Sequence, residues 1–158
     1  MAKNDGKTFE QNIRKQFEAI PNVSVDRIND NVGYSGAYNI ADLIVYRKPY
    51  KYYIECKCVR GTSFPFANIN KKALDDMQYQ SIINGVNCWF IIWFIDLDKT
   101  ICINATEIYA QMYVRNKKSI GVSSFNDYDY ITVKGIKKRK FYNYDLTNLL
   151  DKLDGEMA

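Results

Sequence analysis

The chain has 158 residues, of which 47% are hydrophobic and 25% are charged, and its formal net charge is +4 at pH 7. These values are typical of a folded protein, and the length suffices for one domain with a hydrophobic core, covering residues 1–158, but not for two. The sequence contains no histidine. This excludes Ser-His-Asp and Cys-His catalysis and the usual zinc hydrolases, because each of them requires an imidazole.

The distribution of apolar residues and cysteines indicates a cytoplasmic protein without a membrane span. The longest apolar run, from Cys88 to Ile95, has the length of a strand, whereas a membrane helix needs about 18 such residues. The N-terminal segment MAKNDGKTFEQ is polar and lacks the apolar centre of a signal peptide. The four cysteines, at positions 56, 58, 88 and 102, lie in strand-like segments and are expected to be reduced, buried side chains.

The first half of the chain predicts a helix followed by three strands. Thr8 and Gln11 form a capping-box pattern that opens a helix with an apolar stripe at Phe9, Ile13, Phe17 and Ile20. Residues 23–28 alternate as a strand, and 29–39 form a loop rich in glycine and tyrosine. Residues 40–46 and 50–59 then predict a β-hairpin that turns at Lys48 and Pro49.

The second half predicts further helices and strands in one domain. A connection over 61–70 leads to a helix over 71–84, and the segment 88–95, apolar on both faces, is expected to be the central strand. The remaining expected elements are a strand over 99–103, a helix over 106–114, short strands near 122 and over 130–133, a less regular tail, and a helix over 145–153.

Three charged residues lie inside the predicted hairpin. If the loop is symmetric about Lys48 and Pro49, Asp42 faces Glu55 across the two strands, and Lys57 lies on the same face because side chains alternate. Two facing carboxylates repel each other, and a divalent cation such as Mg²⁺ or Mn²⁺ between them removes this cost. The alternative is an ordinary strand salt bridge between Glu55 and Lys57, with Asp42 solvated on an open face.

Positive charge is concentrated in two short segments. Five cations lie within seven residues, namely Lys134, Lys137, Lys138, Arg139 and Lys140, and Arg115, Lys117 and Lys118 form a second cluster. Such a density suits a phosphate backbone, which is bound with release of counterions. A solvated basic loop is the alternative interpretation.

The charged residues also carry a resemblance. The order of Glu10 in the first helix, Asp42 in one strand and Glu55-x-Lys57 in the next resembles the PD-(D/E)xK nuclease superfamily. More specifically, GKTFEQ at 6–11, ECKCVRGTSFPFANIN at 55–70, KSI at 118–120 and the closing YNYDLTNLLDKL resemble the RecU-type Holliday junction resolvases. The resemblance implies an α/β restriction-endonuclease-like fold, with a central mixed sheet flanked by helices and a short stalk-like loop, 29–39, between the first two strands.

The same resemblance implies a mechanism. Asp42, Glu55 and the backbone carbonyl of Cys56 would hold Mg²⁺ or Mn²⁺, Lys57 would orient or help deprotonate the attacking water, and Glu10 would reach a second metal ion or its water. Arg60 and the 134–140 cluster would bind DNA phosphates. Two tyrosines of the loop, Tyr34 and Tyr38, would stack on bases opened at a crossover.

The implied function is the resolution of Holliday junctions by paired symmetric nicks during DNA recombination and repair. The two-fold symmetry of a four-way junction then implies a homodimer, in a bacterial cell or a phage-infected host. The chain departs from the resolvase pattern in its short stalk and in the helix after TSFP, where Ala73 replaces an expected polar residue and Gln78 or Gln80 is the auxiliary candidate. The alternatives are another nuclease of the superfamily, restriction-like or end-processing, and a non-catalytic DNA-binding module.

Overall fold

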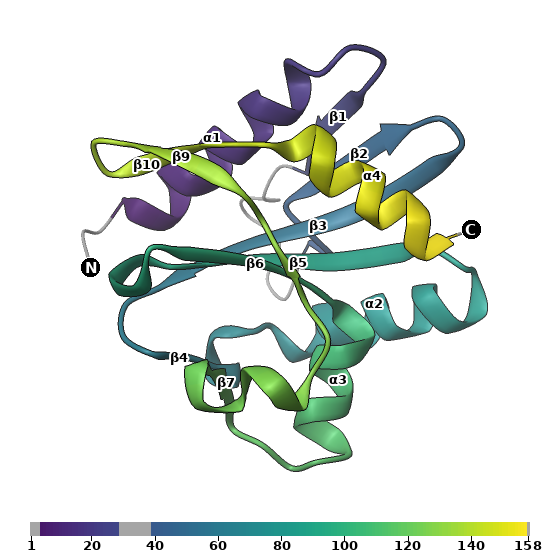
Figure 1. Ribbon diagram of the computed structural model, residues 1–158. Coiled ribbons are helices and arrows are strands. Elements are labelled where there is room, and N and C mark those ends of the chain that lie inside the picture. The colour runs from purple at the N-terminus through teal and green to yellow at the C-terminus, as the bar shows by residue number, and fades with distance from the viewer. Residues whose placement is uncertain (1–3, 29–38, 158) are drawn as a thin grey trace, which may run out of the picture.

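A computed structural model describes residues 4–28 and 39–157, and within them six strands form one mixed sheet (Figure 1). In spatial order the strands are β1 (Ser24–Arg27), β2 (Leu43–Arg47), β3 (Tyr50–Val59), β5 (Asn87–Phe94), β6 (Lys99–Asn104) and β8 (Ile131–Thr132). Strands β3 and β5 are parallel, and all other neighbours are antiparallel. The parallel pair requires a crossover, which the helix between the two strands supplies.

Helices cover both faces of the sheet (Figure 1). One face carries α1 (Asp5–Glu18), α4 (Leu146–Met157) and a hairpin of β9 (Gly135–Lys138) and β10 (Phe141–Tyr144). The other face carries α2 (Lys71–Ile83), α3 (Ala105–Tyr113) and a small ribbon of β4 (Ser63–Pro65) and β7 (Ser119–Gly121). Short 3-10 turns cover Phe66–Asn68 and Ile95–Leu97, and two such turns joined at a kink at Ser124 cover Val122–Asp127.

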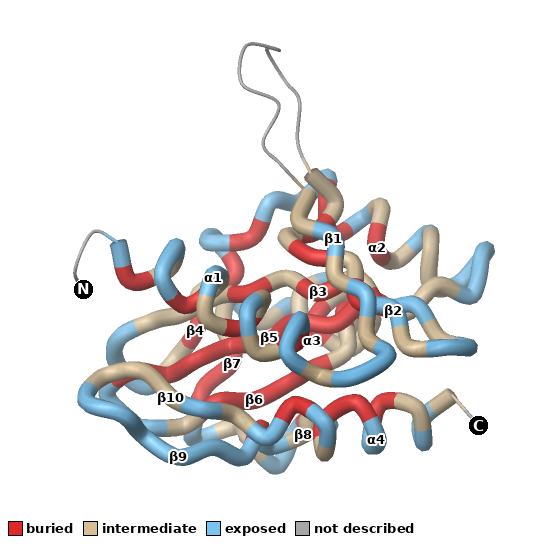
Figure 2. The backbone as a smooth tube through the Cα atoms, turned by 90° about the horizontal axis from the view of Figure 1, so that it is seen from above, coloured by how far each residue is buried: buried red, intermediate tan, exposed pale blue. Residues whose placement is uncertain are grey.

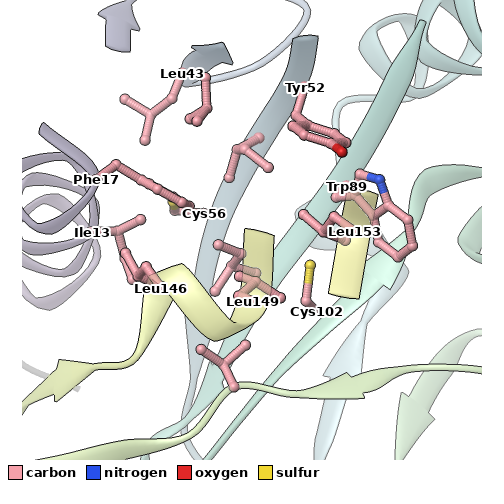
Figure 3. Close-up of a cluster of buried hydrophobic side chains, with 14 of the residues drawn as sticks. Ile13, Phe17, Leu43, Tyr52, Cys56, Trp89, Cys102, Leu146, Leu149 and Leu153 are labelled. Atoms are coloured by element: carbon pink, nitrogen blue, oxygen red, sulfur yellow. The ribbon is translucent and has the colours of Figure 1, made fainter. Parts of the chain in front are cut away.

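The sheet separates two hydrophobic cores. On the α1 side, apolar side chains of both helices pack on β2, β3 and β5, and Figure 3 shows Ile13 and Phe17 of α1 and Leu149 of α4 around Cys56. On the α2 side, Phe64 and Phe66 pack with Leu74 and Met77 of α2 against Phe90 and Ile92 of β5. Strand β5 is therefore buried on both faces, as Figure 2 shows, which confirms the expected central strand.

The alternation along β3 decides which side chains reach which core. Tyr52, Ile54 and Cys56 point to the core on the α1 side, whereas Tyr53 and Val59 join the core on the α2 side. Glu55 and Lys57 share the parity of Tyr53 and Val59, so they lie on the α2 side of the sheet. The hairpin with β2 thus presents its charged residues to the face that α2 and α3 cover.

Some predicted boundaries are wrong. Helix α1 begins at Asp5 with Asn4 as its N-cap, so Thr8 lies inside the helix and does not open it. Asp5 is buried on the side of Phe9 and Ile13 and pairs with Lys140 at 2.6 Å, a long-range contact that the capping pattern does not reveal. Glu10 consequently lies in the second turn of the helix.

Two regions without predicted regular structure contain short strands. The connection 61–70 includes β4, which pairs with β7, and the strand expected near Val122 lies at Ser119–Gly121, with Val122 opening a 3-10 turn. The tail after residue 134 forms the β9–β10 hairpin.

All four cysteines are free, and none of the helices in the described residues is long and apolar enough to cross a lipid bilayer.

Candidate active site

The predicted register of the hairpin is confirmed. Leu43 pairs with Ile54 and Arg47 with Tyr50, so Asp42, directly before β2, lies opposite Glu55. The backbone fixes Asp42 on both sides, because its N–H donates to the carbonyl of Ile54 at 3.1 Å and its carbonyl accepts from the N–H of Ile28 at 2.9 Å. The position of the Asp42 carboxylate is therefore set by two neighbouring strands.

Strand β3 continues past the point where β2 begins, and this leaves one edge of β3 open. The Cys56 N–H points to that edge and donates to Oδ2 of Asp42 at 2.8 Å, so a side chain takes the place of a strand carbonyl. In an extended strand the N–H and C=O of one residue point to the same side. The Cys56 carbonyl therefore faces the Asp42 side of the strand as well.

The two carboxyl groups interact strongly. Burial, a hydrogen bond with Asp42 and the negative charge of Asp42 raise the pKa of Glu55 far above the usual carboxylic range, to about 10. With a pKa raised in this direction, the metal-free pair would keep a proton on Glu55 at a pH where a free carboxyl is ionised, and the hydrogen bond joins this carboxyl to Asp42. The positive charge near the pair is thus too small to keep both carboxyl groups ionised.

Lys57, two residues after Glu55, supplies a positive charge beside the acid pair. Its ammonium acts on Glu55 in the opposite direction to Asp42 and lowers the pKa of that carboxyl, although burial and Asp42 outweigh it. Lys57 is half-buried and lies on the same face of β3 as Glu55. The structure therefore brings Asp42, Glu55 and Lys57 together as the register predicts.

Glu10 lies within electrostatic range of the pair but is engaged elsewhere. Its Oε1 accepts from Nε of Arg27 at 3.0 Å, and only 16% of its side chain is exposed. Its negative charge contributes to the raised pKa of Glu55. Arg27 ends β1 and pairs with Leu43, so it brings Glu10 to the same end of the strands as the acid pair. Sequence patterns did not indicate Arg27, because its role depends on the packing of α1 against β1.

The donor set fits a hard divalent cation. Mg²⁺ in proteins is held by one or two carboxylates together with waters and substrate phosphates, and Asp42, Glu55 and the Cys56 carbonyl match this pattern. A cation between the acids would replace the shared proton and remove the repulsion that raises the pKa of Glu55. Within residues 4–28 and 39–157 no group of three or more acidic or cysteine side chains is clustered for metal binding, so the protein side chains would supply only part of the coordination.

The two auxiliary glutamines have different environments. Gln78 follows Leu74 by one turn on the sheet-facing side of α2, and its Oε1 is buried without a hydrogen-bond partner among the described residues. Gln80 accepts from Asn84 at 2.8 Å at the end of the helix. Gln78 is therefore the better auxiliary candidate, since the side chain of Gln80 is already bonded to that of Asn84.

Four of the predicted DNA-binding cations line one groove of about 470 Å³, namely Arg60, Lys137, Arg139 and Lys140. Lys134 and Lys138 are exposed but do not line it. Trp93 and Ile95 lie in its wall, which places the groove beside the β9–β10 hairpin at the end of β5. Of the cations in the run from 134 to 140, only Lys137 of β9 and the two turn residues Arg139 and Lys140 therefore line this groove.

Three of these cations are already paired with aspartates. Arg60 contacts Asp96 at 2.7 Å, Lys137 contacts Asp98 at 2.8 Å, and Lys140 contacts the buried Asp5 at 2.6 Å. The Gly61 N–H and Arg60 lower the pKa of Asp96, which therefore stays ionised. DNA phosphates would have to compete with Asp96 and Asp98, and Arg139 is the groove cation without a recorded ion pair among the described residues. Tyr34 and Tyr38 lie outside the described residues.

The mixed sheet, with helices on both faces and the acid pair beside the open edge of β3, has the architecture of a restriction-endonuclease-like fold. No protein-family model matches the sequence, and no curated protein matches it either. Among solved structures, the fold is similar to Hjc, a Holliday junction resolvase from the hyperthermophilic archaeon Archaeoglobus fulgidus. The TM-score is 0.55 at 14% sequence identity, over 78% of this chain and 93% of that chain. This similarity confirms the expected α/β fold with a central mixed sheet flanked by helices. The stalk-like loop expected over 29–39 lies, apart from Asn39, outside the described residues.

Proposed function

We propose that this protein is a metal-dependent endonuclease that resolves four-way DNA junctions by paired nicks. The observation that carries the proposal is the pairing of Asp42 with Glu55 at the open edge of β3, with Lys57 on the same face of the strand. The fold, which is also that of an archaeal Holliday junction resolvase, supports the choice of substrate.

The residues of the chain have distinct parts in this chemistry. Asp42, Glu55 and the Cys56 carbonyl would hold Mg²⁺ or Mn²⁺, which polarises a phosphodiester and lowers the pKa of a bound water. The Cys56 N–H keeps Asp42 in one orientation. Lys57 is placed to orient the attacking water or to neutralise charge that develops on the phosphate. Glu10, held by Arg27, adds negative charge that favours cation binding.

A basic groove beyond the end of β3, on the side of the sheet that the β9–β10 hairpin covers, supports DNA binding. The groove of Arg60, Lys137, Arg139 and Lys140 follows directly from β3, which carries Glu55 and Lys57. Phosphates bound there would replace the contacts of Arg60 with Asp96 and of Lys137 with Asp98. In the free protein these ion pairs leave the groove with little net charge. Contacts between the cations and DNA phosphates would make DNA binding strongly dependent on salt. We propose that the protein acts in the cytoplasm, where both DNA and Mg²⁺ are present.

The test is the incubation of purified protein with a labelled synthetic four-way junction, with Mg²⁺ or with EDTA, beside a flap and a linear duplex of the same sequence. We expect symmetric nicks in the junction only with the metal, and no nicks from an Asp42→Asn variant, because an amide is a poor ligand for a hard cation. Equal rates on all three substrates would favour a general nuclease of this fold. Junction binding without nicking would favour a non-catalytic module.

We also propose that two copies act together, because paired nicks on a two-fold symmetric substrate need two active sites. The described surface offers one row of exposed apolar side chains on a single helix, Tyr79, Ile82 and Ile83 of α2, each more than half exposed. The spacing of three and four residues places them on one face. This row is the candidate contact between the copies.

The dimer contact is tested with a double variant, Ile82→Lys with Ile83→Lys. Sedimentation equilibrium is expected to give the mass of two chains for the wild type and of one chain for the variant, because two buried ammonium groups are costly. Ile136→Lys on β9, which is 69% exposed in the same way, is the matched control and should leave the mass unchanged. A wild type that sediments as a single chain at micromolar concentration would contradict the proposal.

A further inference from the structure

A second cavity, distinct from the acid pair and from the groove of Arg60, lies on the α2 side of the sheet. It has a volume of about 570 Å³ and is enclosed by the start of α2, the 3-10 turn after β4, and the end of α3 with the segment that follows it. This volume is in the range of small-ligand pockets and suits one nucleotide better than a double helix.

The charge of this cavity is positive. The described residues that line it include Lys71, Lys117 and Lys118 and no acidic side chain. Lys117 contacts Asp127 at 3.3 Å, whereas Lys71 and Lys118 are exposed. Asp75, one turn after Lys71 on α2, is the acid whose charge reaches the neighbouring Tyr113. The two exposed lysines are therefore available to bind an anion.

The floor of the cavity is apolar and aromatic. Phe66 is buried beneath it, and Tyr113 is 45% exposed at its wall. The ring of Tyr113 lies 4.7 Å from that of Tyr109, which holds it in place. A half-exposed ring beside cations is the arrangement that binds the base and the phosphate of a single-stranded nucleic acid.

The cavity is rigidly connected to the strand that follows the acid pair. Pro65 pairs with Ser119 in the β4–β7 ribbon, and the Phe66 N–H donates to the Lys118 carbonyl at 2.9 Å. Glu55 and Lys57 point to the same side of the sheet as Phe66, so a DNA strand in the cavity would not need to cross the sheet to reach them.

We propose that this cavity binds one unpaired nucleotide of the DNA substrate, with its phosphates on Lys71 and Lys118 and its base on Tyr113. The inference rests on the proposed function, in that it takes DNA as the ligand. In a duplex both faces of a paired base are covered by its neighbours. The Tyr113 ring can therefore stack only on an unstacked base, as at a branch point. The cavity would then select branched over linear DNA.

The test is fluorescence anisotropy with a labelled oligothymidylate in the Asp42→Asn background with EDTA, where nicking cannot interfere. The double variant Lys71→Glu with Lys118→Glu is expected to weaken binding at least about tenfold, and to reduce the slope of log affinity against log salt by about 1.4, or about 0.7 for each lost phosphate contact. The double variant Lys15→Glu with Lys152→Glu, in exposed positions of α1 and α4, has the same change in charge and should keep the slope.

Tyr113→Ala separates base stacking from charge. It is expected to weaken binding of the single strand about fivefold or more and to leave binding of a duplex of equal length unchanged. Photocrosslinking of a 5-iodouracil oligonucleotide, mapped by mass spectrometry, should label Tyr113 or a neighbour in the cavity. Equal losses in the two lysine double variants, or crosslinks confined to other surfaces, would overturn the inference. Wild-type protein that binds in this way without nicking any DNA would refute the catalytic proposal and leave this inference intact.

Discussion

Replacement of Glu55 by glutamine is expected to abolish metal-dependent nicking and, at the same time, to stabilise the metal-free protein at alkaline pH. The loss of nicking follows from the loss of one of two carboxylate ligands, and we expect at least about a 10³-fold decrease in rate, as for other groups that stabilise charge in a transition state. The gain in stability arises because Glu55, beside Asp42, must bind a proton in the folded state at a pH where the unfolded carboxyl has released it, and glutamine carries no such cost.

The sign of the pH dependence follows from the pKa of Glu55, which is raised from 4.5 to about 10 in the folded chain. Between these values the folded protein holds a proton that the unfolded chain has released, so wild-type stability falls as pH rises through this window. The glutamine variant has no such proton, and its advantage over the wild type should therefore grow from pH 5.5 to pH 8.5, by up to about 1.4 kcal/mol per pH unit.

The measurement is urea unfolding with EDTA at pH 5.5 and 8.5. Glu18→Gln is the matched control, because Glu18 is an exposed acid at the end of α1 with a 3.9 Å contact to Arg14, and its stability should follow that of the wild type at both values. A Glu55→Gln variant that is destabilised equally at pH 5.5 and 8.5 would show that the two acids do not share a buried proton.

Trp93→Ala is expected to destabilise the fold by about 3–5 kcal/mol. Trp93 is 1% exposed and its ring lies 5.5 Å from Phe9 of α1 and 5.3 Å from Phe141 of β10. It therefore joins the central strand to the first helix and to the hairpin of the basic groove. Its Nε1 is buried without a hydrogen-bond partner among the described residues, which is a cost that the ring packing must exceed.

Trp93→Phe separates these two contributions. Phenylalanine keeps most of the ring contacts and removes the unpaired N–H, so we expect a loss of about 1 kcal/mol or less. Urea unfolding at pH 7 measures both variants, and the m-value checks that the unfolded states are comparable. A Phe variant as unstable as the Ala variant would mean that the indole N–H has a partner in solution, such as a buried water.

The hairpin register could be predicted because it depends on local features. Lys48 and Pro49 break two apolar segments, and strand periodicity then fixes that Asp42 faces Glu55. The central strand was recognisable because both of its faces are apolar. The β9–β10 hairpin was not recognisable, since β9 is exposed along its whole length and carries charged residues that give no strand pattern.

The partners of the charged residues could not be predicted from spacing. Arg60 and Asp96, Lys140 and Asp5, and Glu10 and Arg27 are separated by 36, 135 and 17 residues, and they meet only because β3, the hairpin and α1 pack together. The basic cluster therefore looked like free positive charge in the sequence, whereas most of its groove is neutralised in the fold.

The amino-acid sequence by itself determined the chemistry available to this protein, with no imidazole and with two acids and a lysine on one hairpin, because residue types and strand alternation are local properties. Only the tertiary structure decided how these groups are used. The end of β2 leaves the Cys56 N–H to Asp42, burial and Asp42 raise the pKa of Glu55, and the packing of distant elements pairs three of the cations with aspartates. Burial and long-range pairing depend on the whole fold, which no short segment encodes.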